Sequence, residues 1–176
     1  MYNFRKLYNS SGGGSDKFYK ENGNVYKNPH TKVVQQIITN LNFKSDINIL
    51  DLGCGGGEVT IALQSKGLNC IHGADPYTYK LYKENTGITA FTYSFQDIAY
   101  NCVELPKYDV IIASFSLHLC PINLLKLTCL NLALNSKWLI IISPHKNPII
   151  QNDFGWNLKT NYKINRVHVR IYKSEF

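Results

Sequence analysis

The sequence has no long hydrophobic run and no paired cysteines, and both absences limit what the protein can be. No apolar stretch approaches the ~20 residues that a transmembrane helix needs, and residues 1–16 lack the apolar centre of a signal peptide. The five cysteines are an odd number without a CxxC spacing. We therefore expect reduced thiols in a cytoplasmic or nuclear protein, with no disulfide framework, no zinc site and no membrane association.

The net charge of the chain is concentrated at its two ends, and the middle of the chain is neutral overall. Hydrophobic residues make up 44% and charged residues 18% of the 176 positions, which is typical of one globular domain. Residues 1–33 carry a net charge of +4 and residues 149–176 carry +3, whereas residues 34–148 sum to zero. Such flanks suit an anionic substrate, perhaps nucleic acid, but they are equally typical of a solvated basic surface.

Apolar and amphipathic segments alternate along most of the chain. We expect helices near 31–41, 57–66, 77–85 and 121–134, a shorter helical piece after Gln96, and strands near 47–51, 69–74, 88–93, 108–114 and 138–143. This alternation predicts an α/β fold, with a mostly parallel sheet and helices on both faces. The last two segments, "WNLKTNYKI" and "RVHVRIYKS", alternate in period two. They predict an antiparallel hairpin at the C-terminus.

The stretch "ILDLGCGGGEVT" (residues 49–60) places a glycine-rich turn between an expected strand and an expected helix, a layout typical of nucleotide sites. A P-loop needs Gly-Lys-Ser/Thr after the turn, but this chain has Gly57 followed by Glu58. A dinucleotide turn needs its third glycine where Glu58 stands, and a carboxylate there disfavours a diphosphate at the helix N-terminus. The turn therefore predicts a ligand without a pyrophosphate and makes an NAD oxidoreductase the less favoured alternative.

Polar side chains follow three successive expected strands, at the edge where ligands of parallel sheets bind. Asp51 favours a cationic group, and Asp75 can accept hydrogen bonds from a ribose. Gln96, Asp97 and Ile98 suit an aminopurine, because Asp97 can accept from the exocyclic amine while Ile98 packs on the ring. Asp75 is equally explained as a turn former, and Asp97 as a helix cap. A ribose, an aminopurine, a cationic centre and no phosphate together describe S-adenosylmethionine.

The ordered motifs resemble those of the class I S-adenosylmethionine-dependent methyltransferases over about residues 31–173. "ILDLGCGGGEVT" is similar to motif I, "GADPY" to the acidic end of the second strand and "FQDIA" to the adenine-contact motif. "YDVIIASFSLHLCP" and "SKWLIIISPHKNP" are similar to the fourth and fifth strands with their loops. The resemblance implies a flexible segment and lid over residues 1–30, one Rossmann-like domain over residues 31–176, and S-adenosylmethionine as cofactor, without a metal.

The resemblance also implies which residues form the cofactor site. They are Asp51, Gly53, Cys54, Gly55 and Gly57 at the methionine end, Asp75 and Pro76 at the ribose, Tyr77, Gln96, Asp97 and Ile98 around the adenine, and Ser114 and Phe115 on the passage to the methyl group.

The methyl acceptor is less well defined by the sequence. Residues 114–117 read "SFSL", not the Asp/Asn-Pro-Pro-aromatic motif of amino-nitrogen methylation. An acidic acceptor needs a general base, and His118 and His145 are the candidate catalytic residues, although each is also explained as an ordinary packed or loop residue. The substrate-facing candidates of the lid are Tyr19, Tyr26 and His30.

Several functions stay open at this point. The charged flanks favour RNA or another anionic acceptor. The aromatic lid favours a small-molecule acceptor as the alternative. A third possibility is a non-catalytic S-adenosylmethionine-binding subunit that activates a partner protein, although such a chain could have lost the intact Asp51 and motif glycines.

Overall fold

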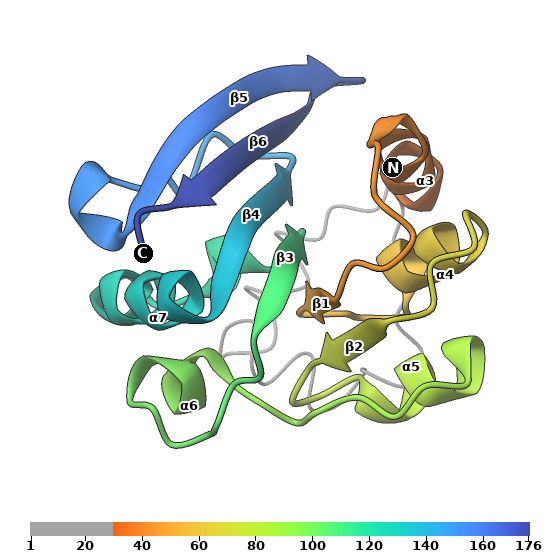
Figure 1. Ribbon diagram of the computed structural model, residues 1–176, viewed down its shortest axis with the longest axis horizontal. Helices are drawn as coiled ribbons and strands as arrows, with labels where there is room; N and C mark the ends of the chain where they lie inside the picture. The colour runs from red at the N-terminus through yellow and green to blue at the C-terminus, as the bar shows by residue number, and fades with distance from the viewer. Residues whose placement is uncertain (1–29) are drawn as a thin grey trace, which may run out of the picture.

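A six-stranded sheet forms the centre of the domain, in the order β2-β1-β3-β4-β6-β5 (Figure 1). The computed structural model describes residues 30–176, so the predictions on the lid, including Tyr19 and Tyr26, lie outside the described residues. The strands are β1 (Ile49–Leu52), β2 (Ile71–Ala74), β3 (Tyr108–Ser114), β4 (Ser136–Ser143), β5 (Trp156–Ile164) and β6 (Val167–Ser174). The first four are parallel, whereas β6 pairs antiparallel with both β4 and β5. The predicted mostly parallel sheet with a C-terminal hairpin is confirmed.

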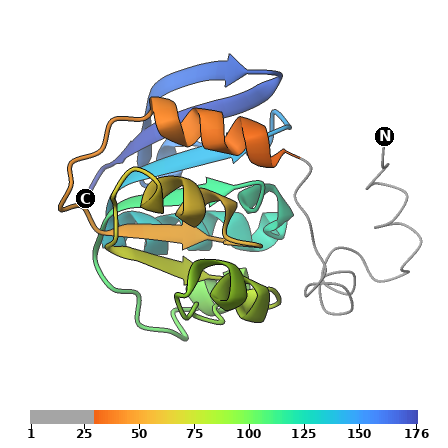
Figure 2. The same ribbon diagram turned by 90° about the vertical axis from the view of Figure 1, so that its right-hand side faces the viewer.

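Helices cover both faces of this sheet (Figures 1 and 2). They are α3 (Thr31–Asn40), α4 (Glu58–Gln64), α5 (Tyr79–Thr86), α6 (Phe95–Ala99) and α7 (Ile122–Asn135), with short 3₁₀ turns η2 (Leu117–Leu119) and η3 (Asn152–Phe154). The helices α3 and α4 pack on one face, and α6 and α7 pack on the other. None of the helices in the described part of the chain has the length and apolar character needed to cross a bilayer.

Alternate residues of the central strands enter two different cores. In β3, Ile111 and Ala113 pack with α6 and α7, whereas Val110 and Ile112 pack with α3 and α4. Because both faces are covered, the strand sequences read as continuous apolar runs. Asp51 interrupts the run in β1 and is nevertheless only 1% exposed. A buried acid in a central strand indicates a functional position rather than a packing choice.

The prediction of a strand over residues 88–93 is wrong. Only Phe91 pairs with the sheet there, through one parallel bridge to Ala74 of β2. The ends of the segment are held by side chains instead, since the Ile88 amide donates to Thr86 Oγ1 and the Ser94 amide donates to Asp97 Oδ2. Beyond this bridge the segment makes no ladder with β2 in the described part of the chain, and the sheet has four parallel strands rather than five.

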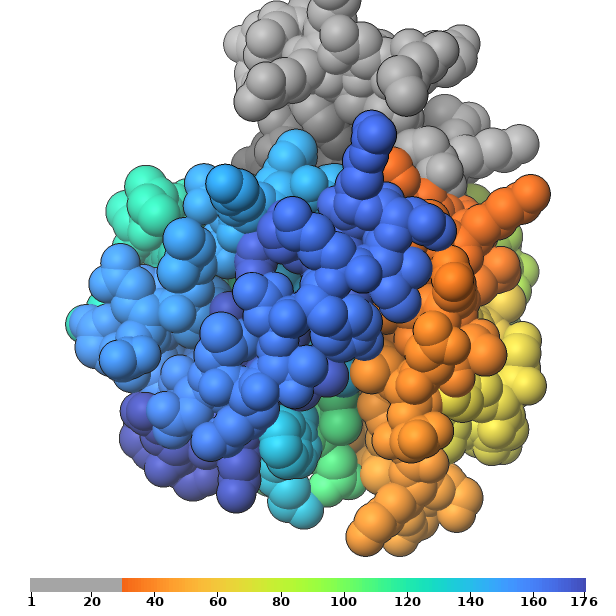
Figure 3. Space-filling view, turned by 90° about the horizontal axis from the view of Figure 1, so that it is seen from above, coloured from red at the N-terminus to blue at the C-terminus, as the bar shows by residue number. Residues whose placement is uncertain are grey.

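The helix α3 lies beside the C-terminal hairpin on the upper side of the molecule (Figure 3). Val34 and Ile38 of the helix share one buried cluster with Val169 of β6. At the hairpin turn, Asn165 Nδ2 donates to Gln36 Oε1 at 3.2 Å. The start of the described chain is thereby packed against its end, at the edge of the sheet toward which the parallel strands point.

Candidate active site

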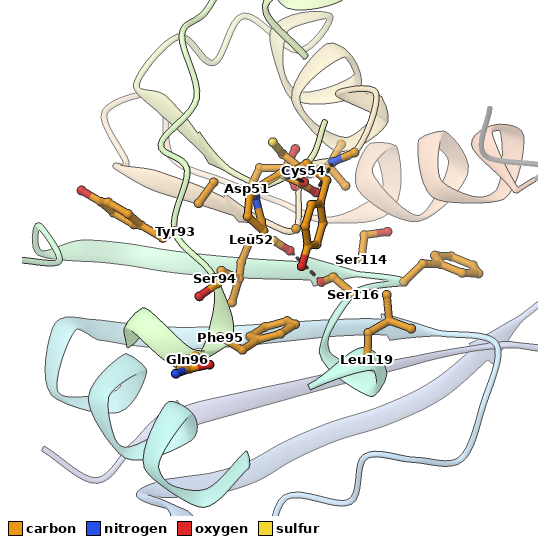
Figure 4. A pocket seen from close by; sticks show the side chains of 18 of the residues that line it. Asp51, Leu52, Cys54, Tyr93, Ser94, Phe95, Gln96, Ser114, Ser116 and Leu119 are labelled. Atoms are coloured by element: carbon orange, nitrogen blue, oxygen red, sulfur yellow. Dashed lines mark hydrogen bonds between the residues drawn. The ribbon is translucent and has the colours of Figure 1, made fainter. Parts of the chain in front are cut away.

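A cavity of about 250 Å³ lies at the carboxyl ends of the parallel strands β1, β2 and β3 (Figure 4). Most residues that the motifs implied for the cofactor line it, namely Asp51, Gly53, Cys54, Gly55, Asp75, Pro76, Tyr77, Gln96, Ser114 and Phe115. Gly57, Asp97 and Ile98 do not belong to the lining. The edge of the sheet therefore brings together segments that are far apart in the sequence, as parallel topology requires.

The glycine turn after β1 is locked to the loop after β3. Gly53 has a φ of +68°, and a Cβ added to it would lie 2.2 Å from the Cβ of Ser116. Ser116 Oγ donates to the carbonyl of Leu52 at 2.7 Å, the contact drawn as a dashed line in Figure 4. Only glycine allows this approach. Gly57 shapes the same turn from behind, because a Cβ there would lie 2.4 Å from Thr86 Cγ2.

Asp51 is buried beside a hydroxyl group rather than a cation. Thr60 Oγ1 of α4 donates to Asp51 Oδ2 at 2.8 Å, and the same hydroxyl lies 2.9 Å from Tyr82 OH. The ion pairs among residues 30–176 join other side chains. Burial raises the pKa of Asp51 to about 8, the Thr60 hydrogen bond opposes this, and the charge of nearby Glu58 adds to it. The acid is therefore mostly protonated at neutral pH and would ionise beside a cationic ligand group.

Asp75 is held at the end of β2 by backbone amides. Its Oδ1 accepts from the amides of Tyr77 and Thr78, both at 2.8 Å, and its Oδ2 accepts from the Gly55 amide at 3.3 Å. The carboxylate thus forms the turn before α5 and also faces the glycine turn across the cavity edge. Its Oδ2 retains acceptor capacity for a ligand hydroxyl.

The segment after Tyr93 reaches the cavity through other residues than the motif implied. Asp97 forms a capping box with Ser94, accepting from its amide at 2.9 Å and its hydroxyl at 2.6 Å, and these bonds lower the pKa of Asp97. Ile98 is buried in the core at 1% exposure. Tyr93, Ser94 and Phe95 line the cavity instead, together with Gln96. Figure 4 has Phe95 and Gln96 on one side of the cavity and Asp51 and Cys54 on the other.

The last residue of β3 and those that follow it line the cavity. Ser114 Oγ is buried and has no hydrogen-bond partner within residues 30–176, which leaves it available to a ligand. Phe115 adopts a φ of +55° and stacks on His30, with ring centroids 4.9 Å apart and planes 15° apart. His30, predicted to face the substrate, thus lies against a residue of the lining. The sequence analysis did not name the remaining lining residues as site residues, although all but Tyr93, Ser94 and Leu124 lie within the quoted motifs. They are Leu52, Glu58, Val59, Ala74, Tyr93, Ser94, Phe95, Ser116, Leu119, Pro121 and Leu124.

The two candidate bases lie together beside the cavity. The rings of His118 in η2 and His145 in the loop after β4 are 5.2 Å apart and inclined at 72°. Neither ring belongs to the lining, although Leu119 does. Burial, and to a smaller extent the charge of His145, lowers the pKa of His118 to about 4. His118 is therefore a neutral imidazole at physiological pH, the form that can accept a proton.

A parallel sheet with a glycine turn after β1 and an acid at the end of β2 defines a Rossmann-like domain for a nucleoside cofactor. The chain belongs to the methyltransferase-domain family, whose model matches residues 27–162, and its fold is that of the class I S-adenosylmethionine-dependent methyltransferases.

Known proteins are similar to the chain in sequence or in fold. An uncharacterised protein of Schizosaccharomyces pombe is 30% identical, over 92% of this chain and 89% of that protein. Magnesium protoporphyrin IX methyltransferase from Synechocystis PCC 6803, solved with S-adenosylmethionine, has a TM-score of 0.61 at 18% identity, covering 97% of this chain and 94% of that one. A TehB-like methyltransferase from Corynebacterium glutamicum has a TM-score of 0.64 at 13% identity, with coverages of 91% and 96%. At such identities the structural likeness supports the fold alone.

Proposed function

We propose that the protein transfers the methyl group of S-adenosylmethionine to an acceptor bound at the carboxyl edge of the sheet. The observation that supports this most directly is the convergence of buried Asp51, the glycine turn and Asp75 on one cavity. An acid without a cationic partner in the described residues suits a cationic ligand, and an acid at the end of β2 suits a ribose. When bound, S-adenosylmethionine supplies a methyl group activated by a sulfonium.

The residues of the cavity fit this cofactor. Gly53 leaves the backbone free to approach the ligand, since no side chain fits at that position. Asp51 would hold the cationic methionine end and Asp75 Oδ2 the ribose. Phe95, near Tyr93, offers an apolar ring to the adenine. The buried Ser114 Oγ, which has no partner among residues 30–176, is a polar group that a ligand in the cavity would satisfy.

The chain itself contributes positioning, exclusion of water and one basic group. Phe115 and Leu119 give the loop after β3 an apolar wall, which disfavours water near the reacting groups. His118 is uncharged at neutral pH and can take the proton that an acidic acceptor loses. Because His118 lies beside the lining, the acceptor would have to extend past Leu119 to reach it.

We further propose an anionic acceptor and regard RNA as the class to test first. Lys163, Arg166 and His168 at the hairpin turn, with Lys146 of the loop after β4, form a group that we call the basic tip. The sheet register pairs His168 with both Lys163 and Ser143, at the carboxyl end of β4. The pKa of His168 is lowered by burial and then by the charges of Lys163, Arg170 and Lys146. A lowered pKa of His168 reports that the cations Lys163 and Lys146 lie near it, and such a group of cations favours phosphate groups.

A small-molecule acceptor is the second candidate. The observation that favours it is the stacking of His30 on Phe115, which narrows access to the cavity from the side of α3. A polymer would have to present one flipped or terminal group to such a site, whereas a small molecule would not.

The test is transfer of labelled methyl from S-adenosylmethionine into RNA, protein and small-molecule fractions of host extract. The proposal requires label in one fraction and its loss with Asp51→Ala. Calorimetric binding of the cofactor without any transfer would favour a non-catalytic subunit or a missing partner protein. Absence of binding would overturn the proposed cofactor site.

The acceptor class has its own control variants. If RNA is methylated, Lys163→Glu with Arg166→Glu should reduce the slope of log affinity against log salt by roughly two. Lys44→Glu with Lys173→Glu makes the same charge change at the opposite edge of the sheet and should leave the slope nearly unchanged. Equal slopes for both double variants would contradict a role for the basic tip.

A further inference from the structure

Arg170 of β6 is a buried cation whose partners are backbone carbonyls rather than a carboxylate. It is 6% exposed. Its Nη1 donates to the carbonyl of Pro148 at 3.1 Å, and its Nη2 donates to the carbonyls of His145 at 3.2 Å and of Lys146. No ion pair of the described residues includes it. Burying a guanidinium is costly without full hydrogen bonding, so these three bonds are what makes the position tolerable.

All three carbonyls belong to one loop, residues 144–148, which joins β4 to the segment before η3. The other attachment of this loop comes from β4 itself, where Ser143 Oγ accepts from the His145 amide at 3.1 Å and donates to the Asn147 carbonyl at 3.3 Å. The planar fork of Arg170 matches several carbonyls at once, which a lysine at this position would not do. The conformation of the loop is therefore set from β6 and β4 together.

The loop carries His145 against His118. Their rings are 5.2 Å apart, and His118 Nδ1 is buried with no hydrogen-bond partner within residues 30–176. His118 follows Ser116 and precedes Leu119, both of which line the cavity. The charged groups on the elements packed around this pair are Lys146 on the loop, and His168 and Arg170 on β6. The charge that contributes to the lowered pKa of His118 is that of His145.

We propose that Arg170 is a positioning residue of the methyl-transfer site, which holds loop 144–148 against η2 and thereby keeps His118 buried beside His145. The inference rests on the proposed function, in which His118 serves as the base. Without the clamp, the loop would leave η2 and water would reach the His118 ring. The imidazole would then titrate close to its ordinary pKa, and it would be partly protonated when the acceptor arrives.

The test is a titration of the histidine rings by NMR on the full chain without cofactor, which needs no acceptor. The His118 signal is assigned by its loss in His118→Gln. In the wild type His118 should titrate near pH 4. In Arg170→Gln the His118 midpoint should rise by at least about one unit toward 6.5. It should also rise in Arg170→Lys, because a lysine lacks the planar guanidinium that bonds several carbonyls at once. An unchanged midpoint in a folded Arg170→Gln chain would overturn the proposal.

The matched control is Lys66→Gln. Lys66 Nζ donates to three backbone carbonyls at the end of α3, those of Ile38, Thr39 and Leu41. Its removal breaks the same number of hydrogen bonds to backbone carbonyls, at an exposed position away from the histidine pair, so the His118 midpoint should stay near pH 4. A shift equal to that of Arg170→Gln would mean that general loosening, rather than the loop, moves His118, and would refute positioning by Arg170.

A second variant keeps the test decisive if Arg170→Gln does not fold. Ser143→Ala removes the other attachment of the loop and leaves Arg170 in place, and the His118 midpoint should rise in the same direction by a smaller amount. A folded Ser143→Ala chain with the wild-type midpoint would then count against the proposal. Where methyl transfer is measurable, the acid limb of its pH profile should follow the His118 midpoint in each variant. Transfer absent from every chain would sink the proposed function, while the titration would still decide the role of Arg170.

Discussion

Asp51 and Thr60 are joined by a hydrogen bond of 2.8 Å between two side chains that solvent does not reach. Thr60 belongs to the helix that follows the glycine turn, so the bond connects the two ends of that turn. The hydroxyl can donate to the acid but supplies no positive charge. The domain therefore keeps a carboxyl group in its interior that is poorly stabilised when ionised. Such an arrangement serves ligand binding better than it serves folding.

Replacing Asp51 by asparagine should stabilise the protein at alkaline pH. The pKa of Asp51 is about 8 in the folded chain and near its ordinary value when unfolded. The folded state thus binds more protons between about pH 4 and pH 8, and the stability of the wild type falls as pH rises through that range. Asp51→Asn removes this loss. We expect its melting temperature to exceed that of the wild type by roughly 5 °C at pH 8.5 and by much less at pH 5. An equal difference in melting temperature at both pH values would contradict a raised pKa of Asp51 in the folded chain.

Binding of S-adenosylmethionine should release a proton from Asp51. At pH 7 the acid is mostly protonated alone, and a cationic group beside it favours the carboxylate. Calorimetry in buffers of different ionisation enthalpy measures the protons released, and we expect a value approaching one. The Asp51→Asn variant, titrated at a higher ligand concentration, should release distinctly fewer protons per cofactor bound. Equal release by both chains would assign the proton to another group.

The Gly53→Ala variant should lose both stability and cofactor binding. It combines a φ of +68° with a clash against Ser116, so we expect roughly 3 kcal/mol or more of destabilisation in urea unfolding. Cofactor affinity should fall at least about tenfold, since the turn cannot keep its place.

Gly67→Ala is the matched control for this glycine. Gly67 has a φ of +81° and open space around an added Cβ, so its replacement by alanine costs only the backbone strain of roughly 1–2 kcal/mol. Adding Ser116→Gly to Gly53→Ala should recover part of the stability that Gly53→Ala loses beyond Gly67→Ala. If the two alanine variants are equally stable, the contact between the β1 and β3 loops does not matter as we describe.

The His118→Gln variant should flatten the acid side of the stability profile. The pKa of His118 is about 4 in the folded chain, below its ordinary value of 6.5. The unfolded state therefore binds more protons between these values, and the stability of the wild type falls as pH drops from 6.5 to about 4. The loss attributable to this group is of the order of 2 kcal/mol. Urea unfolding at pH 7 and pH 4.5 should give a smaller difference for His118→Gln than for the wild type. A parallel loss in both chains would place the effect elsewhere.

Features that depend on short stretches of chain were predictable from the sequence. The glycine turn after β1 is one, because positive φ angles and the strand-to-helix change of period are local properties. The hairpin over residues 156–174 is another, since period-two alternation is a local pattern typical of strands, although β5 buries only Trp156. The positions of Asp51 and Asp75 at neighbouring strand ends followed from parallel topology, which brings the carboxyl ends of strands to one edge.

Other features were decided only in the tertiary structure. The segment over residues 88–93 has strand periodicity but forms one bridge to β2, and Asp97 is used as a cap of α6 rather than at the cavity. The contact of His118 with His145, and the hold of Arg170 on the loop between them, join positions dozens of residues apart. Periodicity and propensity do not extend over such separations. Which distant side chains meet is determined by how the sheet and its loops pack, because burial and hydrogen bonding are satisfied only in the folded chain.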